Sequence, residues 1–343
     1  MTATARPGRL RMGVCLSLSG KYARFGRQAA LGLETWRVLD GAADLIIEDD
    51  HSDPRLLATG LRRLSGRCDV LLGPYSTRLA RTAGDVAAEL GLLIWNHGGA
   101  GDDVQAAHPG HVVSVSTPAS RYAEPFLAWL AGDPARARLW IVHGKGAFAR
   151  QVAAGAEATA RTLGLGTTRL GPGDGPPSPG PPWDLLCAGT FEEDVHTVVR
   201  ASRLPHPPRT VCAVAAGIGE FGRAVPDAEG IFGVGQWFPS GGGPAALGPA
   251  EVEFLAAYPD PGPPDYPAVQ AAAAAVLAAH CMRLAGGTAR ELVWAAAASL
   301  DTSTLFGDFA IDPVNGLQLG HRAVLLRWTR HGPVPAGQRP EGL

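Results

Sequence analysis

A tyrosine and two hydroxyl side chains follow a short apolar run in the segment from Val70 to Ala100. Tyr75, Ser76 and Thr77 come directly after VLLGP, and a helical pattern of apolar residues begins two positions later. A hydroxyl at a helix start lies beside free backbone N–H groups and the positive end of the helix dipole, which together attract anions. The pattern predicts an anion site suited to a carboxylate. Helix capping alone explains the same hydroxyls, and this stretch leaves both interpretations open.

A second turn that could bind a ligand follows the next apolar run, LLIW. It is made of five residues in sequence: Asn96, His97, Gly98, Gly99 and Ala100. In a parallel sheet both turns would emerge at the carboxyl ends of strands, where open α/β sheets bind ligands. His97 is then either a ligand contact or a hydrogen-bonding residue of the turn.

Motifs for catalysis and for cofactors are weak or missing. The sequence has no G-x-S-x-G, H-E-x-x-H or G-x-x-x-x-G-K-[ST] motif, and its five scattered cysteines form no C-x-x-C pair. Two segments, Gly217–Gly222 and Gly144–Ala149, match a dinucleotide-binding pattern. The first runs into Arg-Ala-Val-Pro and the second lacks the expected acidic partner, so turns that allow close backbone approach explain both. We expect no enzyme, no metal and no cofactor.

Composition limits the partners. The 343 residues carry a formal net charge of -2, which predicts neither nucleic-acid nor anionic-membrane binding. The N-terminus has no apolar signal-peptide core, and the alanine run Ala271–Ala279 is too short to span a bilayer. We therefore expect a cytoplasmic protein without membrane insertion, extracytoplasmic only if the true start lies upstream.

The elements that position the two turns alternate between short strands and helices. The predicted strands are 12–18, 44–48, 70–72, 92–95, 111–115, 139–143, 184–188, 210–216, 231–235, 309–311, 317–319 and 323–328. The predicted helices are 27–39, 55–64, 79–90, 122–130, 148–163, 192–203, 251–258, 268–284 and 288–299, with a Pro/Gly-rich loop at 171–182. Such alternation is typical of parallel sheets wound by right-handed crossovers, and here it occurs twice. The pattern predicts an α/β protein with two doubly wound lobes and ligand between them.

Six stretches, in this order, resemble the type I periplasmic substrate-binding proteins of ABC transporters, in the branched-chain amino-acid branch. They are LSLSGKYARFG, IIEDDHSDP, LLGPYSTRLA with GLLIWNHGGA, LCAGTFEEDV, EGIFGVGQWFP and FGDFAIDPVNGLQLGHRAVLLRW. The resemblance implies a Venus-flytrap pair of lobes joined by three hinge crossovers. The lobes would be residues 10–117 with 238–311 and residues 118–237 with 312–330, followed by a loose tail at 331–343.

The resemblance also implies residue roles in the first lobe. The hydroxyl and backbone N–H of Thr77 would hold the ligand carboxylate, and Tyr75 and Ser76 would line the same turn. The carbonyl of Gly98 would accept the ligand ammonium. Ala100 stands where family members commonly carry a threonine, so one polar contact is missing.

Further departures fall in the second lobe. Phe148 and Phe191 match positions often occupied by tyrosine, and Glu220 would supply the acid for an ammonium only if its turn is long. An unmatched hydrogen-bonding group costs about 1–3 kcal/mol when buried, and an unpaired ammonium costs more. We therefore expect a ligand with a carboxylate or amide head and an apolar or aromatic body, which need not carry an amine. Its walls would come from aromatic residues that core packing also explains: Trp95, Phe148, Phe191 and Trp237, with Tyr22 and Phe25 nearer the mouth.

Two functions fit these expectations. One is a non-catalytic substrate-binding protein of an ABC importer, whose partners are a small amino acid, deaminated acid or amide and the permease. The other is a cytoplasmic ligand sensor of the amide-regulator type, which signals closure to a regulatory protein.

Overall fold

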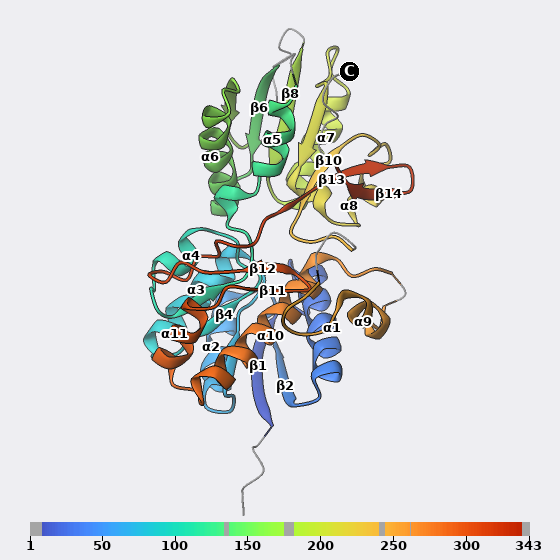
Figure 1. The fold of residues 1–343 in the computed structure, drawn as a ribbon. Helices are drawn as coiled ribbons and strands as arrows, with labels where there is room; N and C mark the ends of the chain where they lie inside the picture. Colours follow the sequence, from blue (N-terminus) through green and yellow to red (C-terminus); the bar gives the residue numbers. More distant parts are fainter. Residues whose placement is uncertain (1–8, 134–136, 175–181, 240–243, 261, 338–343) are drawn as a thin grey trace, which may run out of the picture. The chain divides into compact units, whose positions relative to one another are not determined.

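The computed structural model describes residues 9–133, 137–174, 182–239, 244–260 and 262–337. The chain divides into two compact units (Figure 1). Unit 1 contains Met1–Ser116 and Gly242–His321, and unit 2 contains Thr117–Gly241 and Arg322–Leu343. The third crossover thus follows His321, ten residues after the boundary predicted at 311/312, because residues of this stretch are hydrogen-bonded within unit 1.

Unit 1 is built around a five-stranded parallel sheet in the order β2-β1-β3-β4-β5. Its strands are β1 (Leu10–Leu16), β2 (Ala43–Asp49), β3 (Val70–Leu72), β4 (Ile94–Asn96) and β5 (Val112–Ser114). One face is covered by α1 (Ala23–Asp40) and α10 (Tyr266–Ala285), the other by α2 (Pro54–Ser65), α3 (Thr77–Glu89) and α4 (Asp103–Ala106) (Figure 1). Because both faces are covered, the short strands β3, β4 and β5 are buried at every position.

Local sequence explains most helix starts in unit 1, with one correction. Asp53 caps α2 by accepting hydrogen bonds from the backbone N–H groups of Arg55 and Leu56, and Pro54 is the first residue of this helix, as predicted. Helix α1 begins at Ala23, whereas the sequence predicted a loop up to Gly26. A Cβ at Gly26 would collide with the carbonyl oxygen of Ser17, so this glycine permits close packing inside a helix and does not mark a turn.

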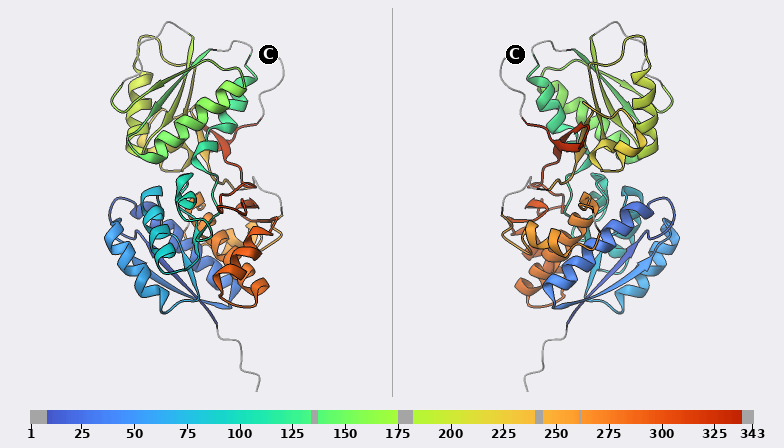
Figure 2. Two further views of the ribbon diagram at one scale, coloured as in Figure 1. Left: turned by 90° about the vertical axis from the view of Figure 1, so that its left-hand side faces the viewer. Right: turned by 90° about the vertical axis from the view of Figure 1, so that its right-hand side faces the viewer.

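Helix α10 corrects the predicted length of the alanine-rich segment. It is a 20-residue helix with a mean hydropathy of 1.4, and among the described helices it is long and apolar enough to cross a membrane. However, 78% of the 18-residue apolar window in this helix is buried inside the protein. Helices α1 and α10 lie side by side (Figure 2), and Gly32 of α1 allows the backbone of Ala268 to approach closely. The alanine run is therefore the core helix of unit 1.

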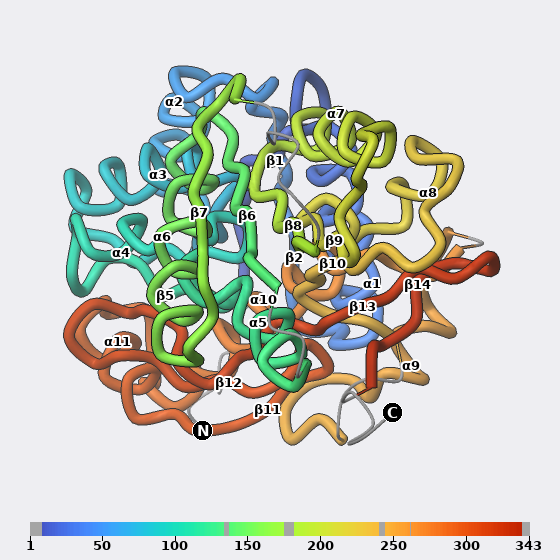
Figure 3. The backbone as a smooth tube through the Cα atoms, turned by 90° about the horizontal axis from the view of Figure 1, so that it is seen from above, coloured from blue at the N-terminus to red at the C-terminus, as the bar shows by residue number. Residues whose placement is uncertain are grey.

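Unit 2 has a seven-stranded sheet in the order β14-β13-β10-β9-β8-β6-β7 (Figure 3). Its strands are β6 (Arg138–His143), β7 (Thr167–Leu170), β8 (Trp183–Ala188), β9 (Thr210–Ala213), β10 (Phe232–Gly235), β13 (Val324–Thr329) and β14 (Gly332–Pro335). Strand β13 pairs antiparallel with both β10 and β14, and the other neighbouring strands pair in parallel. The helices are α5 (Glu124–Ala131), α6 (Ala147–Thr162), α7 (Phe191–Ser202) and α8 (Phe221–Ala224). Alternate residues of β8, Trp183, Leu185 and Cys187, pack with Val198 and Ala201 of α7.

Several short elements differ from the prediction. The sequence missed β7, which is only half-buried, and β14, which pairs with β13 where we predicted a loose tail. Residues 317–319 form no strand and contribute only a bridge between Ile311 and Gln318. The remaining elements of unit 1 are α9 (Glu251–Ala257), α11 (Arg290–Ala298) and the hairpin of β11 (Thr302–Thr304) with β12 (Gly307–Phe309). Residues 175–181 of the predicted loop and 338–343 of the tail lie outside the described residues.

Two buried glutamines fasten the chain on either side of the first crossover. In unit 1, the side-chain amide of Gln318 donates to the carbonyl of Val115 (3.0 Å). In unit 2, Gln236 accepts from the backbone N–H of Thr117 (3.0 Å) and donates to its carbonyl (3.2 Å). Both glutamines are 1% exposed, so these bonds replace strand pairing where the sheets have ended.

Candidate functional site

The turn between β3 and α3 carries the predicted anion site. Ser76 is the N-cap of α3, and its Oγ accepts the backbone N–H of Leu79 at 3.3 Å. The next two amides, those of Thr77 and Arg78, make no hydrogen bond within the described part of the chain. The hydroxyl oxygen of Thr77 accepts the N–H of Gly101 (3.1 Å), which leaves the hydroxyl proton available. Three donors are therefore available at one helix end.

The backbone of Ser76 is strained. Its φ of 90° and ψ of 143° place a non-glycine residue in a region that side chains rarely occupy. This conformation lets the N–H of Ser76 donate to the carbonyl of Gly98 (2.9 Å), and Tyr75 and Gly98 form a parallel bridge. The two predicted turns are therefore hydrogen-bonded to each other at the carboxyl edge of the sheet.

The second turn is held by a residue whose role the sequence analysis missed. The Asn96 side chain accepts the N–H of Gly99 (2.8 Å) and donates to its carbonyl (2.7 Å) and to Ser114 Oγ (2.8 Å). An asparagine before Gly-Gly is a recognisable turn signal, so the sequence carried the information. A Cβ at Gly98 would lie 2.5 Å from the carbonyl oxygen of Pro74, so glycine is required there. The carbonyl of Gly98 retains one free lone pair for a ligand.

Aromatic residues gather beside this site. The Phe25 and Tyr75 rings stack with their centroids 4.2 Å apart and an interplanar angle of 11°. The Tyr75 hydroxyl lies 2.7 Å from that of Tyr266, 191 residues away in sequence. Desolvation raises the pKa of Tyr266 well above its ordinary value, so its hydroxyl stays protonated. Tyr22 is half-buried and its backbone N–H is bound to Ser52 Oγ at 3.0 Å. No local pattern indicated Tyr266, because its partner is so distant in the chain.

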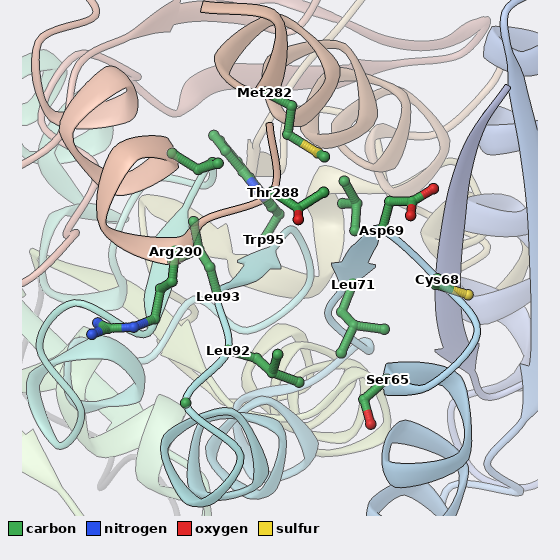
Figure 4. A pocket seen from close by; sticks show the side chains of 13 residues that line it. Ser65, Cys68, Asp69, Leu71, Leu92, Leu93, Trp95, Met282, Thr288 and Arg290 are labelled. Carbon is green, nitrogen blue, oxygen red and sulfur yellow. The ribbon is translucent and has the colours of Figure 1, made fainter. Parts of the chain in front are cut away.

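Trp95 is located in the core. It is 1% exposed and its ring centroid lies 6.4 Å from that of Phe309, which favours the packing interpretation over a role as a ligand wall. Its ring also borders a cavity of about 110 Å³ together with Leu93, Met282 and Thr288 (Figure 4). That cavity is lined by the segments preceding β3 and β4, at the edge of the sheet opposite the two turns.

His97 is buried without side-chain partners. It has no exposed surface, and neither ring nitrogen makes a hydrogen bond within the described ranges. Burial lowers the pKa of His97 to about 4, so the ring is neutral at pH 7. The backbone carbonyl of His97 accepts a hydrogen bond from Ser116 Oγ (2.7 Å). The turn is thus bonded through the backbone of His97, while its ring is unsatisfied.

The predicted residues of unit 2 fall at several turns. Phe148, in the first turn of α6, makes an edge-to-face contact with Tyr122 at a centroid distance of 5.2 Å. Phe191 is the first residue of α7 and is half-buried against the core under that helix. Trp237 is 5% exposed, which favours core packing. Glu220 is the N-cap of α8 and is half-buried.

The described residues offer little support for a metal site or a dinucleotide site. No three His, Cys, Asp or Glu side chains are grouped to hold a metal in the ranges that the structure describes. The first glycine-rich segment is explained by packing, because a Cβ at Gly217 would collide with the carbonyl of Val234 and one at Gly222 with the Trp328 ring. In the second segment a Cβ at Gly144 would collide with the Glu193 carboxylate, whereas one at Gly146 would meet nothing. Helix α8, which follows the first segment, has four residues and offers no extended helix dipole.

Comparison with known proteins identifies related sequences and folds. A family profile described as periplasmic binding protein matches residues 9–180. A search of curated proteins finds no match. Among solved structures, the leucine-binding protein LivK of Thermotoga maritima aligns with a TM-score of 0.79 and 14% identity, covering 97% of this chain and 100% of that one.

Two further solved structures contain bound ligands. A solute-binding protein of an ABC transporter from R. palustris, in complex with benzoate, has a TM-score of 0.72 and 18% identity, with 96% of each chain covered. LivJ of Streptococcus pneumoniae, in complex with isoleucine, has a TM-score of 0.74 and 14% identity, covering 93% of this chain and 95% of that one. At these identities the likeness establishes the type I periplasmic-binding-protein fold.

Proposed function

Because the chain belongs to the periplasmic binding protein family, we propose that it binds a small molecule with a carboxylate or amide head at the start of α3. The observation that carries this proposal is the group of donors at that helix end. The amides of Thr77 and Arg78 and the hydroxyl of Thr77 have hydrogen bonds left to give, and the positive end of the helix dipole favours a negative partner. These donors would bind such a head group without any cationic side chain.

An apolar or aromatic ligand body is the second part of the proposal. The stacked rings of Phe25 and Tyr75 offer a flat surface beside the donors. Ala100, Phe148 and Phe191 lack hydroxyls at positions where the family often has them, so the chain offers fewer partners to a polar ligand body. The ligands bound in the two solved structures, isoleucine and benzoate, both combine a carboxylate with an apolar body.

The proposed biological role is that of the substrate-binding component of an ABC importer, without catalysis. The named relatives LivK and LivJ support this role, and it makes the permease the protein partner. The role requires the protein to act outside the cytoplasm, which is part of the proposal and calls for an export signal.

A thermal-shift panel tests the ligand class. The panel contains leucine, isoleucine and phenylalanine, their deaminated acids, benzoate, and the matching amides. A ligand at about 100 times its dissociation constant stabilises the protein by about 2.7 kcal/mol, which moves the melting temperature measurably. We expect benzoate or a deaminated acid to give the largest shift. A shift with the amino acids alone would show that the ligand requires an amine and would contradict the proposed class.

Thr77→Val tests the site itself. The variant keeps the shape of the side chain and removes the hydroxyl, so affinity for the best ligand should fall by about 1–3 kcal/mol in calorimetric titration. Thr35→Val is the matched control, since Thr35 is a buried threonine of the same unit whose hydroxyl donates to the Leu31 carbonyl within α1. Equal affinities for the two variants would remove Thr77 from the site.

A further inference from the structure

Unit 2 contains a cavity of about 310 Å³ that none of the predicted ligand residues lines. It lies where β6, β7 and β8 end, beside one face of α7. The lining residues are Val142, His143, Gly144, Lys145, Pro172, Gly173, Asp174, Gly189, Glu193, Asp194, His196, Thr197 and Arg200. Its volume is in the range of small-metabolite sites.

The carboxylates around this cavity already have backbone partners. Asp194 accepts the N–H groups of Gly189 (2.7 Å) and Ala215 (2.9 Å). Glu193 accepts the N–H of Thr190 (2.8 Å) and that of Lys145 (3.3 Å).

Asp174 accepts the N–H of Gly171 at 3.1 Å. These bonds hold the turns around the cavity and occupy part of the acceptor capacity of the three acids.

The side-chain nitrogen donors around the cavity, in contrast, have hydrogen bonds left to give. Lys145, His196 and Arg200 are exposed, and none of their side chains has a hydrogen-bond or salt-bridge partner among the residues described. His196 and Arg200 stand four positions apart and so share one face of α7. The ring of His143 uses one nitrogen on the carbonyl of Gly144 (2.9 Å) and keeps the other free.

We propose that this cavity binds a small oxyanion, a carboxylate or phosphate group of a metabolite, through Lys145, Arg200 and His196. These three side chains have donors without partners, two of them carry permanent charge, and charge-assisted bonds to oxyanions are the strong ones. The inference does not depend on the proposed ligand site, because none of the residues proposed to bind that ligand lines this cavity.

The protonation of Asp194 adds to the case. Burial raises the pKa of Asp194 to about 7, so at neutral pH a large fraction of this side chain carries no charge. The repulsion that an incoming anion meets from the cavity wall is reduced accordingly.

Calorimetric titration with inorganic phosphate and, separately, malonate tests the proposal, with chloride adjusted to keep ionic strength constant. We expect saturable binding of at least one probe, and a loss of about tenfold or more in the double variant Lys145→Ala/Arg200→Ala. Arg203→Ala is the control for each of the two substitutions, since it removes one positive charge from the exposed C-cap of α7, outside the cavity. Binding by phosphate alone or malonate alone identifies which oxyanion source the cavity takes.

Three results would overturn the inference. One is the absence of saturable binding for both probes. Another is an equal loss in Arg203→Ala, which would mean that general charge attraction explains the effect. The third is abolition of probe binding by Thr77→Val with the Lys145/Arg200 double variant unaffected, which would place the anion at α3. Circular dichroism of each variant separates these outcomes from misfolding.

Discussion

Replacing Ser76 separates two effects that a single residue combines, capping of α3 and backbone strain. Ser76→Gly relieves a conformation that costs a non-glycine residue about 1–3 kcal/mol. Against this gain stand about 0.5–1 kcal/mol for the extra freedom of glycine in the unfolded chain and a few tenths for the weaker cap. We expect a net stabilisation of about 1 kcal/mol.

Ser76→Ala should behave in the opposite way. Alanine retains the strain and loses the hydrogen bond to the N–H of Leu79, which costs about 1 kcal/mol. The glycine variant should therefore be more stable than the alanine variant by about 2 kcal/mol. Urea denaturation followed by circular dichroism measures this difference directly.

A matched pair at an ordinary helix start provides the reference. Thr190 caps α7 with a φ of -73°, so neither Thr190→Gly nor Thr190→Ala relieves strain, and the two should differ by roughly 0.5–1 kcal/mol, as at an ordinary N-cap. If the two pairs of variants differ by the same amount, Ser76 carries no strain and the reasoning is refuted. If the strain serves the site, the more stable Ser76→Gly protein should also bind its ligand more weakly, since the turn is no longer held in one conformation.

The remaining predictions concern buried charge and close packing. Arg209→Leu should destabilise unit 2 by about 3 kcal/mol in urea denaturation, because it leaves the buried carboxylate of Asp184, now bound at 2.7 Å, without a partner; a loss under about 1 kcal/mol would contradict this. Hydrogen exchange between pH 4 and 7 should show opposite trends in the two units. The lowered pKa of His97 makes unit 1 lose stability as pH falls from about 6.5 towards 4, and the raised pKa of Asp194 makes unit 2 lose stability as pH rises from about 4 to 7. Each effect is on the order of 3 kcal/mol, His97→Leu and Asp194→Asn should flatten the respective trends, and parallel trends would refute the assignment. Gly98→Ala should lower stability by about 1–3 kcal/mol and weaken ligand binding, since its Cβ would force the two turns apart; unchanged affinity would disconnect the second turn from the site.

The sequence contained the fold and the main turn of the candidate site, because both depend on local patterns. Apolar runs and glycine turns marked most of the strands, and the α/β class is confirmed, with one parallel sheet and one that is parallel except for its pairings with β13. The hydroxyls after β3 proved to be at a helix start, where Ser76 is the cap. Their role in ligand binding, and the predicted position of the ligand between two lobes, stay predictions.

What the sequence could not supply depends on contacts between distant residues. The pairing of Tyr75 with Tyr266 spans 191 positions, and no periodicity in either segment indicates it. The core position of Trp95 depends on Phe309, from a hairpin that the sequence only partly revealed. Half-buried strands such as β7 lack the apolar signal on which strand prediction relies.

The two glutamine side chains at the first crossover leave very little free chain between them. Gln318 holds the carbonyl of Val115 and Gln236 holds both backbone groups of Thr117, so Ser116 alone stands between the anchored peptides. The hydroxyl of Ser116 is itself bonded to the carbonyl of His97. The free backbone torsions at this crossover are thus confined to one residue, and a substitution there that changes the allowed torsions would act on the crossover while leaving both sheets intact.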